Sequence, residues 1–320
     1  MLPEGSVDHT VCFRPETLTD FCQQLLTRSA VPVKHAQIVS ESLVAANLRG
    51  VDSHGIQMLV TYLQQLRAGG INAPATGRIV SENGACLIYD GENGLGQVIA
   101  DRCVDHAIRL VRTSGLSLVV ANHSNHFGAG AYWGERIGRA GCVGIVMSNA
   151  CPAVAPWQGR TPVFGTNPLC MAVPDEKWLL DMATTTVALG KLGHAANLNQ
   201  PEIPAAWGFR DESGQITTDT QTAMRGAPSP IGGYKGTGLA MMVEILCAIL
   251  SGGSMATELP IFRTGGRPLG ISHSFLLIDI ERFLPKAGFK ERMDRLTRMV
   301  KTSEPASGYS EVLVAGEPEW

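Results

Sequence analysis

Two histidine-containing segments carry the residue types best suited to proton transfer in this sequence. One is Asp52-Ser53-His54-Gly55, and the other, Asn122 to Gly128 (NHSNHFG), directly follows the apolar run LSLVVA. Strand ends of α/β sheets commonly display reactive groups, and histidine moves protons near neutral pH because its ordinary pKa is about 6.5. The pattern indicates His126 and His54 as acid/base candidates, with backbone-bonded capping histidines as the alternative.

Two other chemistries are open to the same side chains. A metal ion could bind His54, His123 and His126, but the H-E-x-x-H spacing of common zinc sites is missing. Ser53 could act as a nucleophile beside His54, but no G-x-S-x-G elbow occurs and sequence neighbours rarely satisfy triad geometry. We therefore expect no metal centre, and we interpret Ser53 as a helix N-cap.

The common nucleotide-binding signatures are absent from the sequence. No G-x-G-x-x-G follows the first strand, and the nearest match, Gly128-x-Gly130-x-x-x-Gly134, is wrong in spacing by one residue. The run Gly232 to Gly238 (GGYKGTG) contains Lys235 and precedes an apolar helix. Such a turn offers a cation and backbone N–H groups to a phosphate, although a packed loop-to-helix turn would look the same.

Hydrophobic periodicity predicts the elements that must position these groups. Helical spacing predicts helices over 17–30, 34–48, from Gly55 to Gly69, and over 97–113, 129–140, 236–251 and 286–301. Short apolar runs bounded by Gly, Asn and Pro predict strands, which read CLIYD, LSLVVA, CVGIVM, PLCMAV, WLLDMA and SFLLIDI.

The order of these elements predicts two parts. Residues 1–74 together with 281–320 form a helical domain in this interpretation, and residues 75–280 form a central α/β domain. The polar, proline-containing segment 193–230 is expected to be a long ordered loop with a short hairpin around Asp211–Gly214.

Composition restricts the class of protein. The 320 residues are 44% hydrophobic and 17% charged, which is typical of a globular enzyme, and the net charge of -3 without a basic run gives no reason to expect nucleic acid. No stretch of about 18 apolar residues predicts a membrane span. A polar N-terminus and eight cysteines without a C-x-x-C pair predict a cytoplasmic protein with reduced core thiols.

Six motifs, taken together and in order, resemble the type 2 malate/L-lactate dehydrogenase family. They are RGVDSHG (49–55), NHSNHFG (122–128), APWQG (155–159), FGTNP (164–168), LDMAT (180–184) and GGYKG (232–236). That family includes ureidoglycolate and sulfolactate dehydrogenases, diketogulonate reductase and Δ1-piperideine-2-carboxylate reductase. The resemblance implies an α/β (α+β) non-Rossmann fold, whose mixed and largely antiparallel sheet is flanked by helices and accompanied by a helical domain from both chain ends. It also implies a homodimer that uses NADH or NADPH.

The resemblance also implies roles for individual residues. His126 matches the family's acid/base histidine, and Ser53 and His54 match its S-H-G motif beside the nicotinamide. The positions that match cofactor contacts are Asp181, Met182, Ala183, Lys235, Gly236, Gly316 and Glu317. The implied activity is hydride transfer between the nicotinamide and a small 2-oxo or 2-hydroxy acid.

The predicted substrate contacts are Met58, Tyr62, Cys151 and Arg267. Several members of the family have an arginine where this chain has Met58, and some have an acidic residue in place of Cys151. A methionine does not supply the paired charge contact that arginine gives to a carboxylate, so a dicarboxylate is disfavoured. The alternatives are a cyclic imine reductase and, with less support, a metal-dependent hydrolase or lyase or a non-catalytic cofactor-binding protein.

Overall fold

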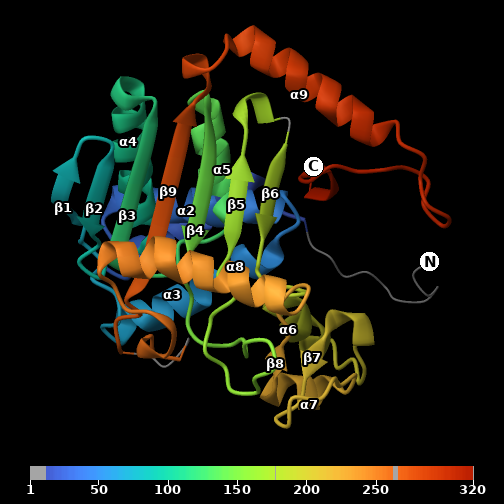
Figure 1. The fold of residues 1–320 in the computed structure, drawn as a ribbon. Coiled ribbons are helices and arrows are strands. Elements are labelled where there is room, and N and C mark those ends of the chain that lie inside the picture. The colour runs from blue at the N-terminus through green and yellow to red at the C-terminus, as the bar shows by residue number, and fades with distance from the viewer. Residues whose placement is uncertain (1–11, 177, 262–265, 320) are drawn as a thin grey trace.

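A seven-stranded sheet forms the centre of the computed structural model, which describes residues 12–176, 178–261 and 266–319 (Figure 1). Its order is β1-β2-β3-β9-β4-β5-β6, and only β2 and β3 pair in parallel. The strands are β1 (Arg78–Asn83), β2 (Cys86–Asp90), β3 (Leu116–Ser124), β4 (Cys142–Ser148), β5 (Leu169–Ala172), β6 (Leu179–Met182) and β9 (Ile271–Asp279). The predicted mixed, largely antiparallel sheet is therefore confirmed.

Helices cover both faces of this sheet. On one face α4 (Gly96–Ser114) and α5 (Gly130–Arg139) pack against β3, β4 and β9 around the fully buried side chains of Trp133 and Phe275. On the other face α8 (Tyr234–Glu244) continues as a π-helix (Ile245–Ile249), and its Val243 and Cys247 pack on Met147 of β4. None of the helices in the described ranges is long and apolar enough to cross a bilayer.

The N-terminal helices form a further layer outside α4. They are α1 (Pro15–Arg28), α2 (Val33–Leu48) and α3 (Gln57–Arg67), and their apolar faces enclose a second core that includes Leu95 and Val98 at the start of α4. The last helix, α9 (Lys286–Lys301), lies beyond the upper end of the sheet in Figure 1, whereas α3 lies near its lower end. The division into 1–74 with 281–320 and 75–280 stays a prediction.

The segment 193–230 differs from its prediction as a long ordered loop. It holds the end of α6 (Leu189–Asn197), the short helix α7 (Thr220–Arg225) and a two-stranded pair, β7 (Phe209–Arg210) with β8 (Ala227–Pro228). These elements enclose a small core of Leu192, Ala195 and Phe209, and burial of that core stabilises helices too short to form alone. The turn at Asp211–Gly214 is confirmed by the hydrogen bond from the Gly214 amide to the Asp211 carbonyl.

Candidate active site

His126 lies in the loop between β3 and α5, where its ring meets side chains from two N-terminal segments. The Tyr62 hydroxyl on α3 lies 2.7 Å from His126 Nδ1, and the Gly128 backbone amide faces the same nitrogen at 3.4 Å. The His54 ring stacks on His126 with centroids 5.4 Å apart, and Ser53 Oγ lies 2.9 Å from His54 Nδ1. The structure thus brings together the four residues Ser53, His54, Tyr62 and His126, which the sequence predicted for one site. The interpretation of Ser53 as a helix N-cap is wrong, because Ser53 lies inside the 3-10 turn Asp52–His54 and the N-cap residue of α3 is Ile56.

The backbone that carries His126 is fixed to the start of α4. Asn125 Nδ2 donates to Asn93 Oδ1 and to the carbonyl oxygens of Asn93 and Gly94. Gly96, the first residue of α4, packs so tightly on this loop that an added Cβ would lie 2.4 Å from the His126 carbonyl oxygen. The ring of His126 is therefore held by a rigid frame rather than by a mobile loop.

Three residues of this environment were missed by sequence reasoning. Gln97 is fully buried, and its Nε2 donates to the Tyr62 hydroxyl at 2.9 Å. His273 on β9 is fully buried between Ser124 Oγ and Ser148 Oγ, at 2.9 and 3.0 Å from its two ring nitrogens. Asn125, described above, is the third. The interactions of Gln97 and His273 join segments far apart in sequence, so no local pattern marks them. Asn125 stands inside the NHSNHFG motif, and only its bonds to Asn93 and Gly94 were missed.

Burial sets the charge state of the site. Removal from water, together with smaller contributions from the nearby His54 and His273, lowers the pKa of His126 to about 3. Burial also lowers the pKa of His54 and raises the pKa of the Tyr62 hydroxyl above its ordinary range. His126 is therefore neutral near pH 7 and Tyr62 keeps its proton.

A small cavity of about 10 Å³, enough for roughly one water molecule, lies beside His126. Its described lining contains no Lys, Arg, Asp or Glu and consists of Thr61, Tyr62, Gln65, Ile71, Leu95, Gly96, Asn125, His126 and Leu269. In the described part of the chain, Gln65 Oε1 and Asn125 Oδ1 are buried without a hydrogen-bond partner. Buried polar atoms normally have one, so these oxygens suit donor groups of a ligand or a water molecule.

None of the other predicted substrate contacts, Met58, Cys151 and Arg267, is among the described residues that line this cavity. Met58 is buried in the hydrophobic cluster of α3, one turn before Tyr62. Cys151 is buried against Leu269, which lines the cavity, and burial raises the pKa of its thiol to about 11. Arg267 is exposed and is not part of the cavity lining.

Asp181 on β6 meets the N-terminus of α5. Its Oδ2 accepts a hydrogen bond from the Ala131 amide at 2.7 Å. The N-cap residue of α5 makes no side-chain hydrogen bond to the helix. The side chain remains accessible to solvent, yet the surrounding protein desolvates it enough to raise its pKa to about 6, against the lowering effect of the Ala131 amide. Met182 and Ala183 follow it with partial exposure.

The C-terminal residues predicted to contact the cofactor lie along the same strand. The Leu179 amide of β6 donates to the Ala315 carbonyl at 3.3 Å, and Gly316 turns beside Leu179 with a φ of 95°. Glu317 forms an ion pair with Lys301 of α9 and accepts from the Val314 amide at 2.9 Å. This part of the predicted cofactor set is therefore gathered at β6, while the role of each residue stays a prediction.

The glycine-rich loop precedes α8. Gly232 and Gly233 have φ values of 56° and 63°, a backbone conformation that side chains with a Cβ rarely adopt, and α8 has no side-chain cap. Lys235 is exposed, and in the described ranges no carboxylate pairs with it. Gly236 is buried against the Ile231 backbone, where an added Cβ would lie 2.4 Å from the Ile231 nitrogen, so it closes the loop.

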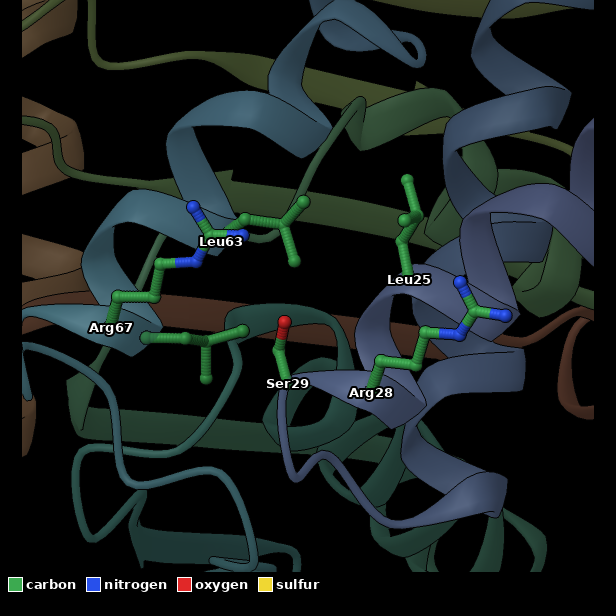
Figure 2. Close-up of a pocket in the computed structure, with 6 residues that line it drawn as sticks. Leu25, Arg28, Ser29, Leu63 and Arg67 are labelled. Carbon is green, nitrogen blue, oxygen red and sulfur yellow. The ribbon is translucent and has the colours of Figure 1, made fainter.

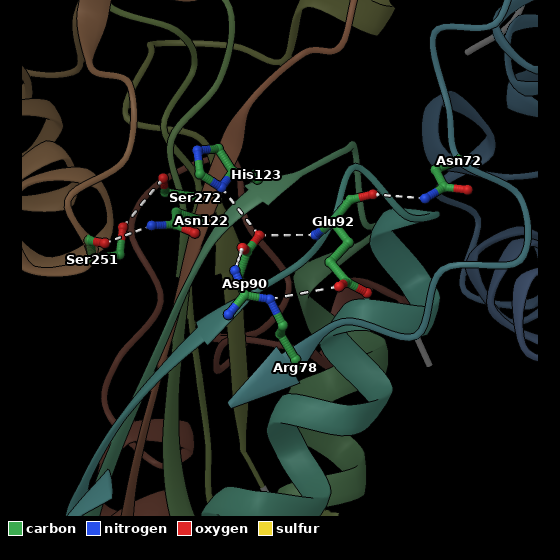
Figure 3. Close-up of polar contacts among 8 residues, drawn as sticks. All are labelled: Asn72, Arg78, Asp90, Glu92, Asn122, His123, Ser251 and Ser272. Carbon is green, nitrogen blue, oxygen red and sulfur yellow. Dashed lines mark hydrogen bonds and ion pairs between the residues drawn. The ribbon is translucent and has the colours of Figure 1, made fainter. Parts of the chain in front are cut away.

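His123, in contrast, belongs to the surface. Its Nδ1 lies 3.1 Å from Asp90 Oδ1, in a polar group with Arg78 and Glu92 (Figure 3). No three His, Cys, Asp or Glu side chains within the described ranges converge as metal ligands. The three-histidine metal hypothesis therefore has no ligand set there.

A larger hollow of about 290 Å³ lies between α1 and α3 (Figure 2). Leu25, Ser29, Leu63 and two arginines line it. Arg28 and Arg67 are the last residues of their helices, where positive charge complements the helix dipole. We assign this hollow no role in the reaction because its arginines have that structural explanation.

Comparison with known proteins gives a consistent result. A model of the malate/L-lactate dehydrogenase family matches residues 13–320. The chain is 36% identical to malate dehydrogenase of Pyrococcus horikoshii over 99% of its length and 90% of that protein's, and the solved structure of that enzyme superimposes with a TM-score of 0.89. It is 33% identical to ureidoglycolate dehydrogenase (NAD(+)) of Escherichia coli, over 95% and 87% of the two chains.

A third similar protein is the Δ1-piperideine-2-carboxylate reductase of Pseudomonas syringae. Its solved structure shares 26% identity with this chain and a TM-score of 0.85, and the match covers 97% of this chain and 92% of the other. One fold thus accommodates proteins named for hydroxy acids and for a cyclic imine.

Proposed function

This chain belongs to the malate/L-lactate dehydrogenase family, and the relatives described above include dehydrogenases that act on a CH–OH group. We propose that it interconverts a small 2-oxo acid and its 2-hydroxy acid, with His126 as the acid/base. The observation that carries this proposal is the position of His126. It lies at a strand end, beside a cavity, with Nδ1 engaged by Tyr62. Its other ring nitrogen, Nε2, is the atom that we assign to proton transfer.

The residues near the two candidate cofactor segments fit a dinucleotide. The uncapped N-terminus of α8 and the Lys235 ammonium would hold a phosphate, and the accessible strand end at Asp181 would meet the rest of the molecule. When bound, nicotinamide supplies or accepts the hydride. Both NADH and NADPH are to be tested.

The protein's own contribution is to hold and move one proton. In the oxidation direction, Nε2 of neutral His126 accepts the proton of the substrate hydroxyl, and in reduction the protonated ring returns it to the oxygen or nitrogen formed at C2. Burial excludes water from this exchange. The hydrogen bond between Tyr62 and His126 Nδ1 fixes the orientation of the ring. General acid–base catalysis of this kind contributes about 10²–10⁴-fold in rate.

The lining of the cavity supports a substrate with a single carboxylate. No cationic side chain of the described chain lines it, and Leu269 does. Behind the lining, Met58 belongs to the hydrophobic cluster of Tyr62, and Cys151 packs with Leu269. A second carboxylate in such a place would lose its hydration without gaining a charged partner. The same observation favours a cyclic imino acid as the second candidate, because its ring is apolar and its nitrogen needs only one proton.

The direct test follows absorbance at 340 nm with NADH and with NADPH over pyruvate, oxaloacetate, other 2-oxo acids and the five- and six-membered cyclic imino acids. We expect oxidation of the cofactor by monocarboxylates or imines and a weaker response to oxaloacetate. A preference for oxaloacetate would overturn the cavity argument. Binding of NADH or NADPH without turnover of any compound would favour the non-catalytic alternative.

The homodimer and the cytoplasmic location stay predictions from the sequence.

The pH dependence of the two directions tests the charge state of His126. Reduction needs the protonated ring, whose fraction falls about tenfold per pH unit above the pKa, while oxidation uses the neutral ring. With a pKa of about 3, kcat/KM for reduction should fall continuously between about pH 5 and 8, and kcat/KM for oxidation should stay level. Initial rates at constant ionic strength measure both. A break in both profiles near pH 6.5 would show that the histidine titrates normally.

A further inference from the structure

Two amide oxygens in the wall of the small cavity lack a hydrogen-bond partner among the described residues. They are Oε1 of Gln65 and Oδ1 of Asn125, and both residues line the cavity beside His126. Gln65 is 4% exposed and Asn125 is 2% exposed. An unsatisfied acceptor at that depth is costly, and buried polar atoms normally have a donor. The described chain supplies none, which leaves a group bound in the cavity as its source.

The hydrogen bonds of Asn125 identify its Oδ1 as the atom that needs a donor. Its Nδ2 donates to Asn93 Oδ1 at 3.0 Å, and to the carbonyl oxygens of Asn93 and Gly94 at 3.1 and 2.8 Å. A half-turn of the amide would place an oxygen against these three acceptors. The orientation of the amide is therefore fixed, and its oxygen can be satisfied only by an incoming N–H or O–H.

Gln65 Oε1 is held in the same network. It packs on Gly70, just beyond the end of α3, where an added Cβ would lie 2.3 Å from this oxygen. Asn93 joins this corner to the His126 loop, because its Nδ2 donates to the Gly70 carbonyl at 3.0 Å and its Oδ1 accepts from Asn125. The two free acceptors are thus kept in place by one set of contacts, as expected of a preformed binding site.

The reacting groups of a 2-oxo acid do not supply the missing donor. Its carbonyl and carboxylate oxygens only accept, and the hydroxyl formed at C2 has a single proton, which the proposed mechanism exchanges with His126. A second carboxylate would bring two further acceptors. The cavity has room for roughly one water-sized group. Among the groups of such a substrate, this leaves a small O–H or N–H on the side chain.

We propose that Gln65 is a specificity-determining residue, which together with Asn125 selects a 2-oxo acid whose side chain has an uncharged O–H or N–H donor. The simplest member of this class has a hydroxyl on C3. An alkyl group in its place would leave two buried oxygens unpaired, and a carboxylate would be repelled by them. The inference rests on the proposed function, because it names the substrate class of the same site.

Two isosteric pairs of compounds test this selection in the intact protein with its cofactor. 3-Hydroxypyruvate and 2-oxobutyrate differ by a hydroxyl in place of a methyl group, and 2-oxosuccinamate and oxaloacetate differ by an amide in place of a carboxylate. Absorbance at 340 nm with NADH or NADPH gives kcat/KM for each compound. The wild type should prefer the donor-bearing member of each pair about ten- to a hundredfold, because the other member leaves a buried hydrogen bond unmade.

Gln65→Met should reduce the preference in the first pair to about threefold or less, because kcat/KM falls for 3-hydroxypyruvate and not for 2-oxobutyrate. Gly70→Ala should reduce it as well, since the new Cβ displaces Gln65 Oε1. The matched control is Gln64→Met, which changes the exposed neighbour on α3 and should leave the ratio as it is. A purely structural role of Gln65 would lower both values equally, and thermal unfolding checks the fold of each variant.

Equilibrium binding separates this inference from the proposed function. Glycerate and 2-hydroxybutyrate are the reduced forms of the first pair and do not react with NADH or NADPH, so calorimetry gives their dissociation constants without turnover. Glycerate should bind about ten- to a hundredfold more tightly to the wild type, and Gln65→Met should remove the difference. That result without turnover of any 2-oxo acid would contradict the proposed reaction and support the selection by Gln65.

Two results would overturn the inference. One is equal kcat/KM for 3-hydroxypyruvate and 2-oxobutyrate in the wild type, or equal dissociation constants for their reduced forms, which would show that a water molecule satisfies the two oxygens. The other is a preference that both Gln65→Met and Gly70→Ala leave intact, which would assign the selection to other residues. If Gln65→Met does not fold, Gly70→Ala decides, because it keeps the amide and changes only its place.

Discussion

Replacement of His126 by alanine should lower kcat for reduction about 10²–10⁴-fold while the dissociation constant for NADH or NADPH stays the same. The variant removes the group that donates the proton to C2-bound oxygen or nitrogen, but not the α8 loop or the β6 strand end that we assign to the cofactor. Steady-state rates at saturating substrate measure the loss, and fluorescence titration measures cofactor binding.

The matched control is His123→Ala. His123 is the same residue type three positions earlier, exposed and bonded to Asp90. Its replacement should leave kcat within about twofold, because surface changes away from special features are usually small. Equal losses in the two variants, or wild-type turnover by His126→Ala, would remove His126 from the mechanism.

Substitution of Gly96 by alanine should lower kcat about a hundredfold, although Gly96 itself carries no reactive group. The new Cβ would lie 2.2 Å from the Asn125 carbonyl oxygen and 2.4 Å from that of His126, so the loop or the start of α4 must shift. Displacement of a catalytic group by about 1 Å typically costs about 10²-fold in rate. The measurement is kcat at saturating substrate, with thermal unfolding to separate a displaced loop from an unfolded protein.

Gly193→Ala is the corresponding control. Gly193 lies inside α6, and an added Cβ meets no described atom within 4 Å. Alanine is favoured over glycine in a helix, so activity should persist and stability should hold or rise slightly. If Gly96→Ala keeps wild-type kcat, the tight packing beneath the His126 loop does not position the ring.

The parts of the fold that sequence reasoning predicted are those with strong local periodicity. The helix predicted at 286–301 is α9 with the same bounds, and the helix predicted over 97–113 is α4 within one residue at each end. The place of β9 between β3 and β4 was not predicted. Its residues follow β3 by about 150 positions in the chain, and only the completed sheet brings them together.

The segment 193–230 shows a different limit. It is polar and carries prolines, which favours a loop, yet α7 forms there because Asp219 caps it and Ala223 packs into the small core around Phe209. Tertiary burial decides such short helices, and a single sequence contains little trace of it.

Within the site, sequence reasoning predicted the residues that belong to recognisable motifs. It did not predict the residues that hold those side chains in place. His54 and His126 stand out by type and setting, whereas Gln97 is one polar residue in an otherwise unremarked helix start. Its importance arises from its bond to Tyr62, 35 positions away. Asp181 was predicted only as a cofactor contact, and the structure adds its bond to the start of α5.

The most direct test of hydride transfer at this site uses NADH and NADPH carrying deuterium on either face of nicotinamide C4. The reaction is run with the best 2-oxo or imino acid of the panel, and the product is analysed by mass spectrometry. We expect deuterium at C2 of the product from one face only, and almost none in the same time with His126→Ala. Product without deuterium from either cofactor, or equal incorporation by the His126→Ala variant, would contradict the account.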